Sequence, residues 1–551
     1  MFLEIDTSLF SSPEFIAILG AAGALAFIAR STLSWYNNPS RLLPGPKNQS
    51  WLYGSMRSMP DAAAVHLQME WLREYGSTFR FFGLLSQPMI LTTDVTALRH
   101  ILNNVHLYQK SPYVRRQLGE ILGNGLLAVE GEAHKRQRRV VNPAFGPLQI
   151  KRFATLFIEK SNEMVSMWSD LCSNTSRKDG FVRLDAFAWL NKVTLDIMGI
   201  AGFGYAIDSM HAPDNHPNEL NEAVRVIASA ELDAATIIQL TIPALGSLPT
   251  TRVRATRNAN ATIREIGMKL VQEKKTAVLA AAGGDEAHGL EKKHFAGNDL
   301  LSLLIRANMS SDVPQHARLT DEDILAQVPT VLVAGHETTS TSVAWTLLAL
   351  ATNQRVQNKL RDEIFTHDTS TPSESELNSL TYLEWVVREA MRIHAPIFSS
   401  ERVAMQDDVV PLREPYVDRS GAVRHEIHVR KGDIFSIPVN ILNRSPEVWG
   451  EDAHEFRPER WEHIPDAVKD IPGVWSNMLT FMAGPHSCPG FRFNIVEMKA
   501  LLFAIIRAFE VEMALPAADI VPKTMIVTRP ALMSNPEAGP QLPLLIRPVR
   551  V

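Results

Sequence analysis

Apolar side chains recur three and four positions apart along two long parts of the chain, residues 150–275 and 320–365. This spacing puts the apolar positions on one face of a helix, so it predicts that most of the middle of the chain is helical. Three short runs are typical of strands instead: Phe79–Phe82, Met89–Thr92 and Ile434–Val439. The pattern therefore predicts a mainly α fold with small β-sheets, an α+β architecture.

The first hydrophobic segment, Phe15–Ala29, has fifteen residues and no charge. As a helix it spans roughly 22 Å, less than the roughly 30 Å of a bilayer's hydrocarbon core. Extension through Trp35 and Tyr36 reaches about 33 Å, provided that Arg30 extends to the surface. Both aromatic rings then lie at the membrane interface. We therefore predict an N-terminal transmembrane helix within residues 1–36.

The charges around this segment orient the predicted anchor. Acidic residues precede it and basic residues follow it, so the positive-inside rule places the body of the chain in the cytosol. A cleaved signal peptide is an alternative, but no Lys or Arg precedes the apolar run. A helix buried in the core is a second alternative. The acids are Glu4, Asp6 and Glu14, and the bases are Arg30, Arg41 and Lys47.

Two prolines flank a glycine in Arg41–Lys47. This pattern cannot continue a helix and stiffens the chain locally. We interpret residues 37–50 as a proline-containing hinge, and residues 51–551 as the folded body. A small, polar, glycine-containing stretch at 280–294 predicts a surface loop that does not divide this body.

Composition narrows the class of protein. The 551 residues are 45% hydrophobic and 21% charged, which excludes a disordered chain, a fibre and a multi-span membrane protein. The formal charge of −5 gives no general attraction to nucleic acid. Only Cys172 and Cys488 are present, so a disulfide-built secreted scaffold is excluded as well.

Phe481–Gly490 carries the strongest chemical signal. Glycines stand four positions before and two after Cys488, and glycine allows backbone angles that bring amide groups close to a bound group. A helical pattern follows from Phe491 to Phe509, and its N-terminal end would stabilise negative charge on the sulfur. The loop is predicted to present a thiolate, either to a metal or as a nucleophile. A buried free cysteine is the alternative.

The loop resembles the F-x-x-G-x-R-x-C-x-G sequence of the cytochrome P-450 family of haem-thiolate enzymes. Phe481, Gly484, Cys488 and Gly490 match, whereas His486 stands at the arginine position. The resemblance implies that Cys488 is the axial ligand of the iron of haem b. It also implies that His486 contacts a haem propionate, with a shorter reach than arginine and a charge that depends on pH.

Two further motifs resemble the same family. Glu389 and Arg392 lie three apart in a helical run and match its E-x-x-R element. Phe456–Trp461 resembles its P-E-R-F/W element, which contains Arg460 here. The resemblance implies a buried Glu389–Arg392–Arg460 network beneath the haem loop, with a structural role. A solvated ion pair is the alternative.

The polar segment Ala334–Ser340 interrupts an apolar helix predicted from about Asp323 to Ala351. Polar groups in mid-helix point to a functional site, and threonine there can bond the carbonyl four residues back. The segment resembles the family's A-G-x-E/D-T-T oxygen-activation motif. The match implies that Thr338 holds the oxygen species and that Glu337 relays protons to it. Pro329 is expected to kink the helix or end its first part.

Three more residues match propionate contacts of the family. His134 and Arg138 lie four apart on one helix face, with His134 in place of a tryptophan, and Arg402 follows Arg392 by ten residues. Basic residues off this face are predicted to form a patch for an acidic electron donor, a solvated surface being the alternative. They are Lys135, Arg136 and Arg139.

The resemblance runs from about Pro44 to the C-terminus. Together with the anchor, it is closest to eukaryotic, especially fungal, microsomal members. It implies a monooxygenase in the endoplasmic reticulum membrane that receives electrons from NADPH through a separate flavoprotein reductase, with cytochrome b5 as a candidate second donor. It implies no nucleic-acid partner.

The substrate pocket implied by the resemblance is largely apolar. This favours a hydrophobic small molecule, and our hypothesis is a terpenoid or another secondary-metabolite intermediate; steroid, fatty-acyl and xenobiotic compounds are alternatives. An O2-independent haem-thiolate isomerase and a non-enzymatic haem sensor or electron carrier are less favoured, because the chain retains Glu337 and Thr338. The pocket residues are Leu118, Ile121, Leu332, Ile397, Phe398, Ile526 and Val527.

Overall fold

The computed structural model describes residues 38–55, 62–174, 177, 179–212, 218–228, 250–283, 297–309, 315, 318–524 and 526–549. The predicted anchor, residues 1–36, lies outside this part, as does most of the predicted 280–294 loop. Residues 280–283 belong to a helix instead. Within the described part, no helix has both the length and the apolar character needed to cross a bilayer.

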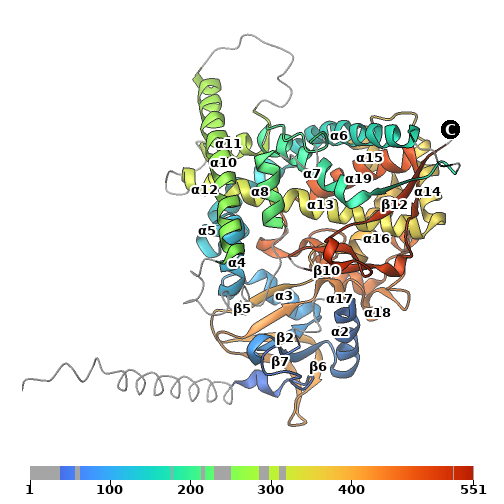
Figure 1. Cartoon of the computed structure of the whole chain (residues 1–551). Helices are drawn as coiled ribbons and strands as arrows, with labels where there is room; N and C mark the ends of the chain where they lie inside the picture. Colours follow the sequence, from blue (N-terminus) through green and yellow to red (C-terminus); the bar gives the residue numbers. More distant parts are fainter. Residues whose placement is uncertain are drawn as a thin grey trace, which may run out of the picture.

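Helices dominate the described chain, as the apolar spacing predicts. In Figure 1 they fill the upper part of the molecule, while the sheet that contains β2 and β5 lies below, near α2 and α3. The helices are α2 (Ala62–Tyr75), α3 (Val95–Asn103), α4 (Pro112–Leu122), α5 (Gly131–Val141), α6 (Pro147–Ser173), α7 (Ala186–Phe203), α8 (Glu219–Ala228), α10 (Thr251–Gly283), α11 (Leu300–Met309), α12 (Asp321–Leu325), α13 (Gln327–Thr352), α14 (Gln354–Phe365), α15 (Glu374–Ser379), α16 (Thr381–Ile393), α17 (Val439–Leu442), α18 (Pro446–Trp449) and α19 (Phe491–Ala508).

The strands form small separate sheets, and all three predicted strands are confirmed as β1, β2 and β8. The largest sheet has the order β1-β2-β8-β5-β3, in which only β2 and β8 pair in parallel. The others are β4-β12-β9, β10-β11 and β6-β7. The strands are β1 (Thr78–Phe82), β2 (Pro88–Thr92), β3 (Tyr108–Gln109), β4 (Val182–Asp185), β5 (Ser400–Ala404), β6 (Asp408–Val417), β7 (Val423–Val429), β8 (Ile434–Ile437), β9 (Phe509–Met513), β10 (Ile520–Thr524), β11 (Thr528–Leu532) and β12 (Pro543–Pro548).

The segment predicted as a hinge, 37–50, is packed against the largest sheet over residues 38–45. The N–H of Arg80 donates to the carbonyl oxygen of Pro44 at 2.8 Å, and Leu43 is fully buried. Gly45 has a φ of 147°, and a Cβ there would lie 1.9 Å from the carbonyl oxygen of Arg80. Glycine is therefore required by close approach to β1. These residues form part of the folded body, in contrast to the predicted hinge.

Helix α13 runs through the core and carries the predicted polar segment. It packs against α7, α16 and α19, and most of its side chains are buried on all sides. Hydroxyls of its polar segment are hydrogen-bonded within the helix, since those of Thr338, Thr339 and Ser342 donate to the carbonyl oxygens four residues back. The chain breaks at Ala326 between α12 and α13, because Pro329 has no N–H to donate to the carbonyl of Leu325. This confirms that the proline ends the first part of the predicted helix.

Helix α19 begins at Phe491, as predicted, and packs along α6. Its side chains from Phe493 to Ile506 are all buried. Because this helix is so well packed, it has little freedom to move. It therefore fixes the end of the cysteine-containing loop that precedes it.

Candidate functional site

The loop around Cys488 consists of two short 3-10 helices, η10 (Leu479–Phe481) and η11 (Gly484–His486), followed by α19. The N–H of Cys488 donates to the carbonyl oxygen of Phe481 at 2.9 Å, which closes the loop on itself. Gly484 has a φ of 67°, and a Cβ there would lie 2.3 Å from the carbonyl oxygen of Leu102. This position requires glycine on both counts.

Gly490 differs from the prediction for a special backbone conformation. Its φ is −88°, which any residue adopts, and a Cβ there would meet no atom nearer than 3.5 Å, on Phe145. The protein backbone by itself does not demand glycine here.

The protein alone does not turn the Cys488 thiol into a thiolate. Burial raises the pKa of this thiol, and a hydrogen bond from the N–H of Gly490 and the charge of Arg138 act in the opposite direction without overcoming it. A coordinated metal cation deprotonates a thiol outright. Cys172, on α6, is also free, so neither cysteine is in a disulfide.

The predicted propionate contacts gather beside this loop. The guanidinium of Arg138 donates to the carbonyl oxygen of Ser487. The ring of His134, from α5, lies edge-on to that of His486 with 4.0 Å between centroids. Burial lowers the pKa of His134 to about 3, so this ring is neutral. Arg402 on β5 is 4% exposed and interacts electrostatically with the same group of residues.

Two residues that the sequence patterns did not indicate complete this group. The carboxylate of Glu130 lies 3.0 Å from Nε2 of His486 and accepts a bond from Nζ of Lys110 at 2.6 Å. No local signal marks them, because a glutamate beside the start of a helix is ordinarily explained by the helix dipole and a single lysine is usually on the surface. We call the set Lys110, Glu130, His134, Arg138, Arg402 and His486 the basic cradle.

The basic cradle and the thiol fit a haem. Both ring nitrogens of His486 are buried and have no hydrogen-bond partner among the described residues. The one N–H of this imidazole and the cations Lys110, Arg138 and Arg402 offer donors suited to two carboxylates. Cys488 offers a sulfur ligand for iron. The residues present therefore suit a porphyrin with two propionates, held by the cradle and by Cys488.

The polar segment of α13 forms a second part of the site. The hydroxyl of Thr338 donates to the carbonyl oxygen of Ala334 at 2.7 Å, as expected of a threonine in mid-helix. Glu337 is 5% exposed and forms an ion pair with Arg529 of β11, a partner that the sequence did not indicate. Burial lowers the pKa of His336 to about 4, so the neighbouring imidazole is neutral.

Helices α13 and α19 are joined by polar side chains within the core. The amide of Asn494 donates to the hydroxyl of Thr339 at 2.9 Å. One turn further along α19, Glu497 is fully buried, and burial raises its pKa well above the usual range. The contact between Asn494 and Thr339 ties the helix after the cysteine to the helix that carries Thr338.

The structure brings the three residues of the predicted ion-pair network together. Arg392 makes two hydrogen bonds to the carboxylate of Glu389, at 2.7 and 2.9 Å, and Arg460 lies 3.2 Å from it. The Glu389 and Arg392 side chains are fully buried, and that of Arg460 is 2% exposed. The indole N–H of Trp461 also donates to the carboxylate. Each partner is thus paired in a dry environment.

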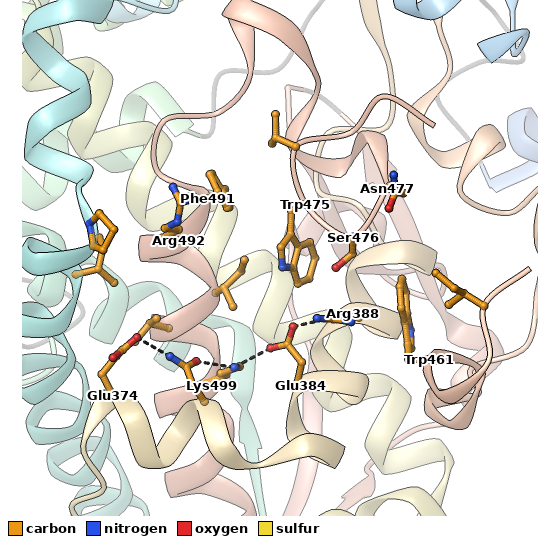
Figure 2. Close-up of a pocket in the computed structure, with 17 residues that line it drawn as sticks. Glu374, Glu384, Arg388, Trp461, Trp475, Ser476, Asn477, Phe491, Arg492 and Lys499 are labelled. Atoms are coloured by element: carbon orange, nitrogen blue, oxygen red, sulfur yellow. Dashed lines mark hydrogen bonds and ion pairs between the residues drawn. The ribbon is translucent and has the colours of Figure 1, made fainter. Parts of the chain in front are cut away.

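A cavity of about 630 Å³ lies between α6, α16, α19 and the segment 461–477. Figure 2 shows that ion pairs cross it: Lys499 lies 2.7 Å from Glu384, which also pairs with Arg388 at 2.6 Å. Charged groups placed in this way suit a polar rather than an apolar occupant. We therefore do not assign this cavity to a hydrophobic substrate.

These features define a haem-thiolate protein: a single cysteine beside a cationic cradle, and an acid–threonine pair on a buried helix. The chain matches the model of the cytochrome P450 family over residues 44–534, and it belongs to that family. The resemblance seen in the motifs is thereby confirmed.

Curated relatives agree with this assignment. The chain is 47% identical over 514 residues to cytochrome P450 monooxygenase 205 of Postia placenta, with 93% of each chain covered. It is 43% identical over 525 residues to monooxygenase 128 of the same fungus, covering 94% of this chain and 95% of that one. It is 32% identical over 526 residues to monooxygenase claU of Ampulloclitocybe clavipes, with 92% of each covered. The protein is an oxidoreductase of the monooxygenase class.

We predict that Glu389→Gln lowers the free energy of unfolding by about 3–5 kcal/mol, because it leaves Arg392 buried without an anion and leaves Arg460 with Asp452 alone. Glu462→Gln, at an exposed position in the short 3-10 helix η8 (Pro458–Glu462) that contains Arg460, is the control and should change stability little. Denaturant unfolding of both variants measures the difference. Equal stability of the two would show that the buried network contributes nothing.

Proposed function

We propose that this enzyme inserts one atom of O2 into a hydrophobic small molecule, a terpenoid or another secondary-metabolite intermediate. The observation that carries the proposal is the joint presence of the Cys488 loop with its basic cradle and of the Glu337–Thr338 pair on α13. A haem sensor or carrier needs no such acid–threonine pair. Bound haem supplies the electron transfer and oxygen activation, which no side chain can provide.

The residue roles in this proposal follow from their positions. Cys488 holds the iron, and the basic cradle holds the propionates. Thr338 is partly exposed while its neighbours Glu337 and Thr339 are buried, so it is the residue of the three that is accessible to a reacting oxygen. Glu337 passes protons toward Thr338, and its ion pair with Arg529 fixes where that carboxylate lies.

The apolar character of the pocket residues supports a hydrophobic substrate. Leu118, Ile121, Leu332 and Val527 are buried, with 0–8% of their surface exposed. Ile526 differs, since 40% of it is exposed. Burial of an apolar substrate against such side chains provides about 25 cal/mol per Å² of contact, without requiring any specific polar partner.

Electron supply and location belong to the same proposal. Electrons come from NADPH through a flavoprotein reductase, with cytochrome b5 as a candidate second donor. Lys135 and Arg139 are exposed on α5 and suit an acidic donor surface, whereas Arg136 is only partly exposed and lies 3.6 Å from Asp323. We place the catalytic body on the cytosolic face of the endoplasmic reticulum, attached by residues 1–36.

The function is tested by expressing the protein together with a cytochrome P450 reductase in a host supplied with candidate terpenes. We expect new products heavier than a substrate by one oxygen atom, dependent on NADPH and labelled by ¹⁸O2. Product formation that continues without NADPH and O2 would instead identify an isomerase. The Cys488→Ala variant is the matched control for background activity of the host.

We predict that Thr338→Ala retains haem but lowers product formed per NADPH by roughly tenfold to a hundredfold, with the electrons appearing in peroxide. The reason is the loss of the hydroxyl through which a proton reaches the reacting oxygen. Thr346→Ala removes a similar hydroxyl two turns along the same helix, bonded to the carbonyl of Ser342, and should leave coupling unchanged. Identical coupling in the two variants would remove Thr338 from the mechanism.

Membrane attachment is tested by comparing the full chain with a chain that begins at residue 38. The full chain should sediment with microsomal membranes and resist extraction by high salt, because about twenty apolar residues suffice to cross a bilayer. The shortened chain should lose most of this attachment. Equal sedimentation of both chains in high salt would assign membrane binding to another part of the protein.

A further inference from the structure

Arg80 of β1 is a buried cation without a hydrogen-bonded counter-ion. Only 2% of the residue is exposed, and its Nε and Nη1 have no hydrogen-bond partner among the described residues. The guanidinium lies over the ring of Phe82, with 4.9 Å to the ring centroid. Buried charges are normally paired, and an aromatic ring compensates only part of the cost of burying one. The guanidinium therefore has donors left for a ligand.

The alternation of side chains along β1 shows which face of the sheet carries Arg80. Phe79 and Phe81 point toward α2, where the centroids of their rings lie 6.0 and 6.2 Å from that of Trp71. Successive side chains of a strand point to opposite faces, so Arg80 lies on the face away from α2. The helix that covers the phenylalanine face therefore does not supply the missing partner.

A second guanidinium lies beside this strand. Arg419 is in the turn between β6 and β7, and its Nη2 donates to the carbonyl oxygen of Gly45 at 3.0 Å. Its backbone N–H donates to the carbonyl oxygen of Leu42 at 2.8 Å, which fixes the turn on the same segment. Pro44 of this segment accepts the backbone N–H of Arg80. The fold thus holds two cations on adjoining segments.

The electrostatics of Arg80 agree with a missing anion. Burial and, secondly, the charge of Arg419 lower the pKa of Arg80 to about 10, and no carboxylate among the described residues acts in the opposite direction. Arg80 still carries its charge at neutral pH. The acid next to Arg419 in the chain, Asp418, is engaged elsewhere, since it accepts hydrogen bonds from Ser420 and Arg424. A bound anion would supply the charge that the fold does not provide here.

We propose that Arg80 and Arg419 form a binding site for an oxyanion of the phosphate type. A guanidinium binds phosphate through paired N–H donors, and the several oxygens of the anion can accept from two arginines at once. Free phosphate and the headgroup of a phospholipid share this chemistry. Pro44 follows the end of the predicted anchor by eight residues, which span at most about 28 Å. The lipid source, unlike the site itself, therefore rests on the membrane attachment proposed above.

The test measures binding of radiolabelled inorganic phosphate to the full chain in an uncharged sugar detergent, by equilibrium dialysis at constant ionic strength. Arg80→Met should weaken binding by about tenfold to a hundredfold, the effect of lost hydrogen bonds to a charged group. Arg419→Met should weaken it by less, because Arg419 is exposed. Arg73→Met removes one positive charge at an exposed position of α2 and is the matched control, which should bind phosphate as the wild type does.

A second readout separates a ligand site from a structural arginine. Without phosphate, Arg80→Met should raise the unfolding temperature, because an apolar side chain replaces an unpaired buried charge. Added phosphate should raise the unfolding temperature of the wild type but not that of Arg80→Met. Phosphate binding that is equal in the two proteins would overturn the proposal. If Arg80→Met does not fold, Arg80→Lys keeps the charge but lacks the planar fork, and it should still bind phosphate more weakly than the wild type.

Vesicles of phosphatidylcholine distinguish the two sources of the anion. If lipid phosphate occupies the site, added phosphate should not raise the unfolding temperature of the reconstituted full chain, although it does so in detergent. If soluble phosphate is the ligand, the rise should persist in vesicles. Acetate that binds as tightly as phosphate, or a wild-type protein that binds no phosphate in detergent, would overturn the proposal. A full chain that does not remain with the vesicles would reject only the proposed membrane attachment, because the measurement in detergent does not depend on it.

Discussion

The site depends on a thiol that the protein by itself does not ionise. Burial raises the pKa of Cys488, and the nearest stabilising groups are one backbone N–H and the guanidinium of Arg138. Nucleophilic cysteines in proteins have their pKa lowered by the environment, so this one is unsuited to act alone. It is well suited to a metal, whose charge supplies the missing stabilisation. Bound haem iron would supply that charge at Cys488.

Rigid helices hold the two halves of the site in relation to each other. Helix α19 starts three residues after Cys488, and its Asn494 is hydrogen-bonded to Thr339 of α13, next to Thr338. The buried network around Glu389 supports the same loop from another side. In this network Arg392 and Arg460 donate hydrogen bonds to backbone carbonyl oxygens of a neighbouring segment. The charged groups of the Glu389 network are paired with one another, so a low-dielectric interior can contain them. The packed helices and the buried ion pairs thus leave Cys488 and Thr338 little freedom to move.

Local patterns in the sequence predicted many of these helices and strands. The start of α19 at Phe491, the strands β1, β2 and β8, and the break before Pro329 all follow from short-range rules of spacing and backbone chemistry. The partners of Glu389 could also be named, because three motifs matched one family in the right order. Gly490 and the segment 38–45 show the limit of such rules. Glycine at 490 is not required by its own backbone, and the prolines around Gly45 serve close packing rather than separation.

Long-range partners were not predictable from the sequence. Glu130 with Lys110, and Glu337 with Arg529, come from elements that only the tertiary fold brings together. The motif marks Glu337, but Glu130, Lys110 and Arg529 have no neighbour pattern that distinguishes them from surface charges. Their significance depends on burial, which sequence patterning indicates for apolar side chains but not for charged ones. The substitution of His486 for arginine was visible in the sequence. Only the structure could place the Glu130 carboxylate beside it and Lys110 on that carboxylate.

The most direct measurement of the central claim is the difference spectrum of the reduced enzyme with and without CO. A thiolate bound to haem iron gives this family its red-shifted Soret band. If Cys488 is the iron ligand, we expect that band in the wild-type protein and in Cys172→Ala, and its loss in Cys488→Ala. A red-shifted band that survives in Cys488→Ala would contradict the assignment of this sulfur as the iron ligand, and with it the arrangement of the whole site.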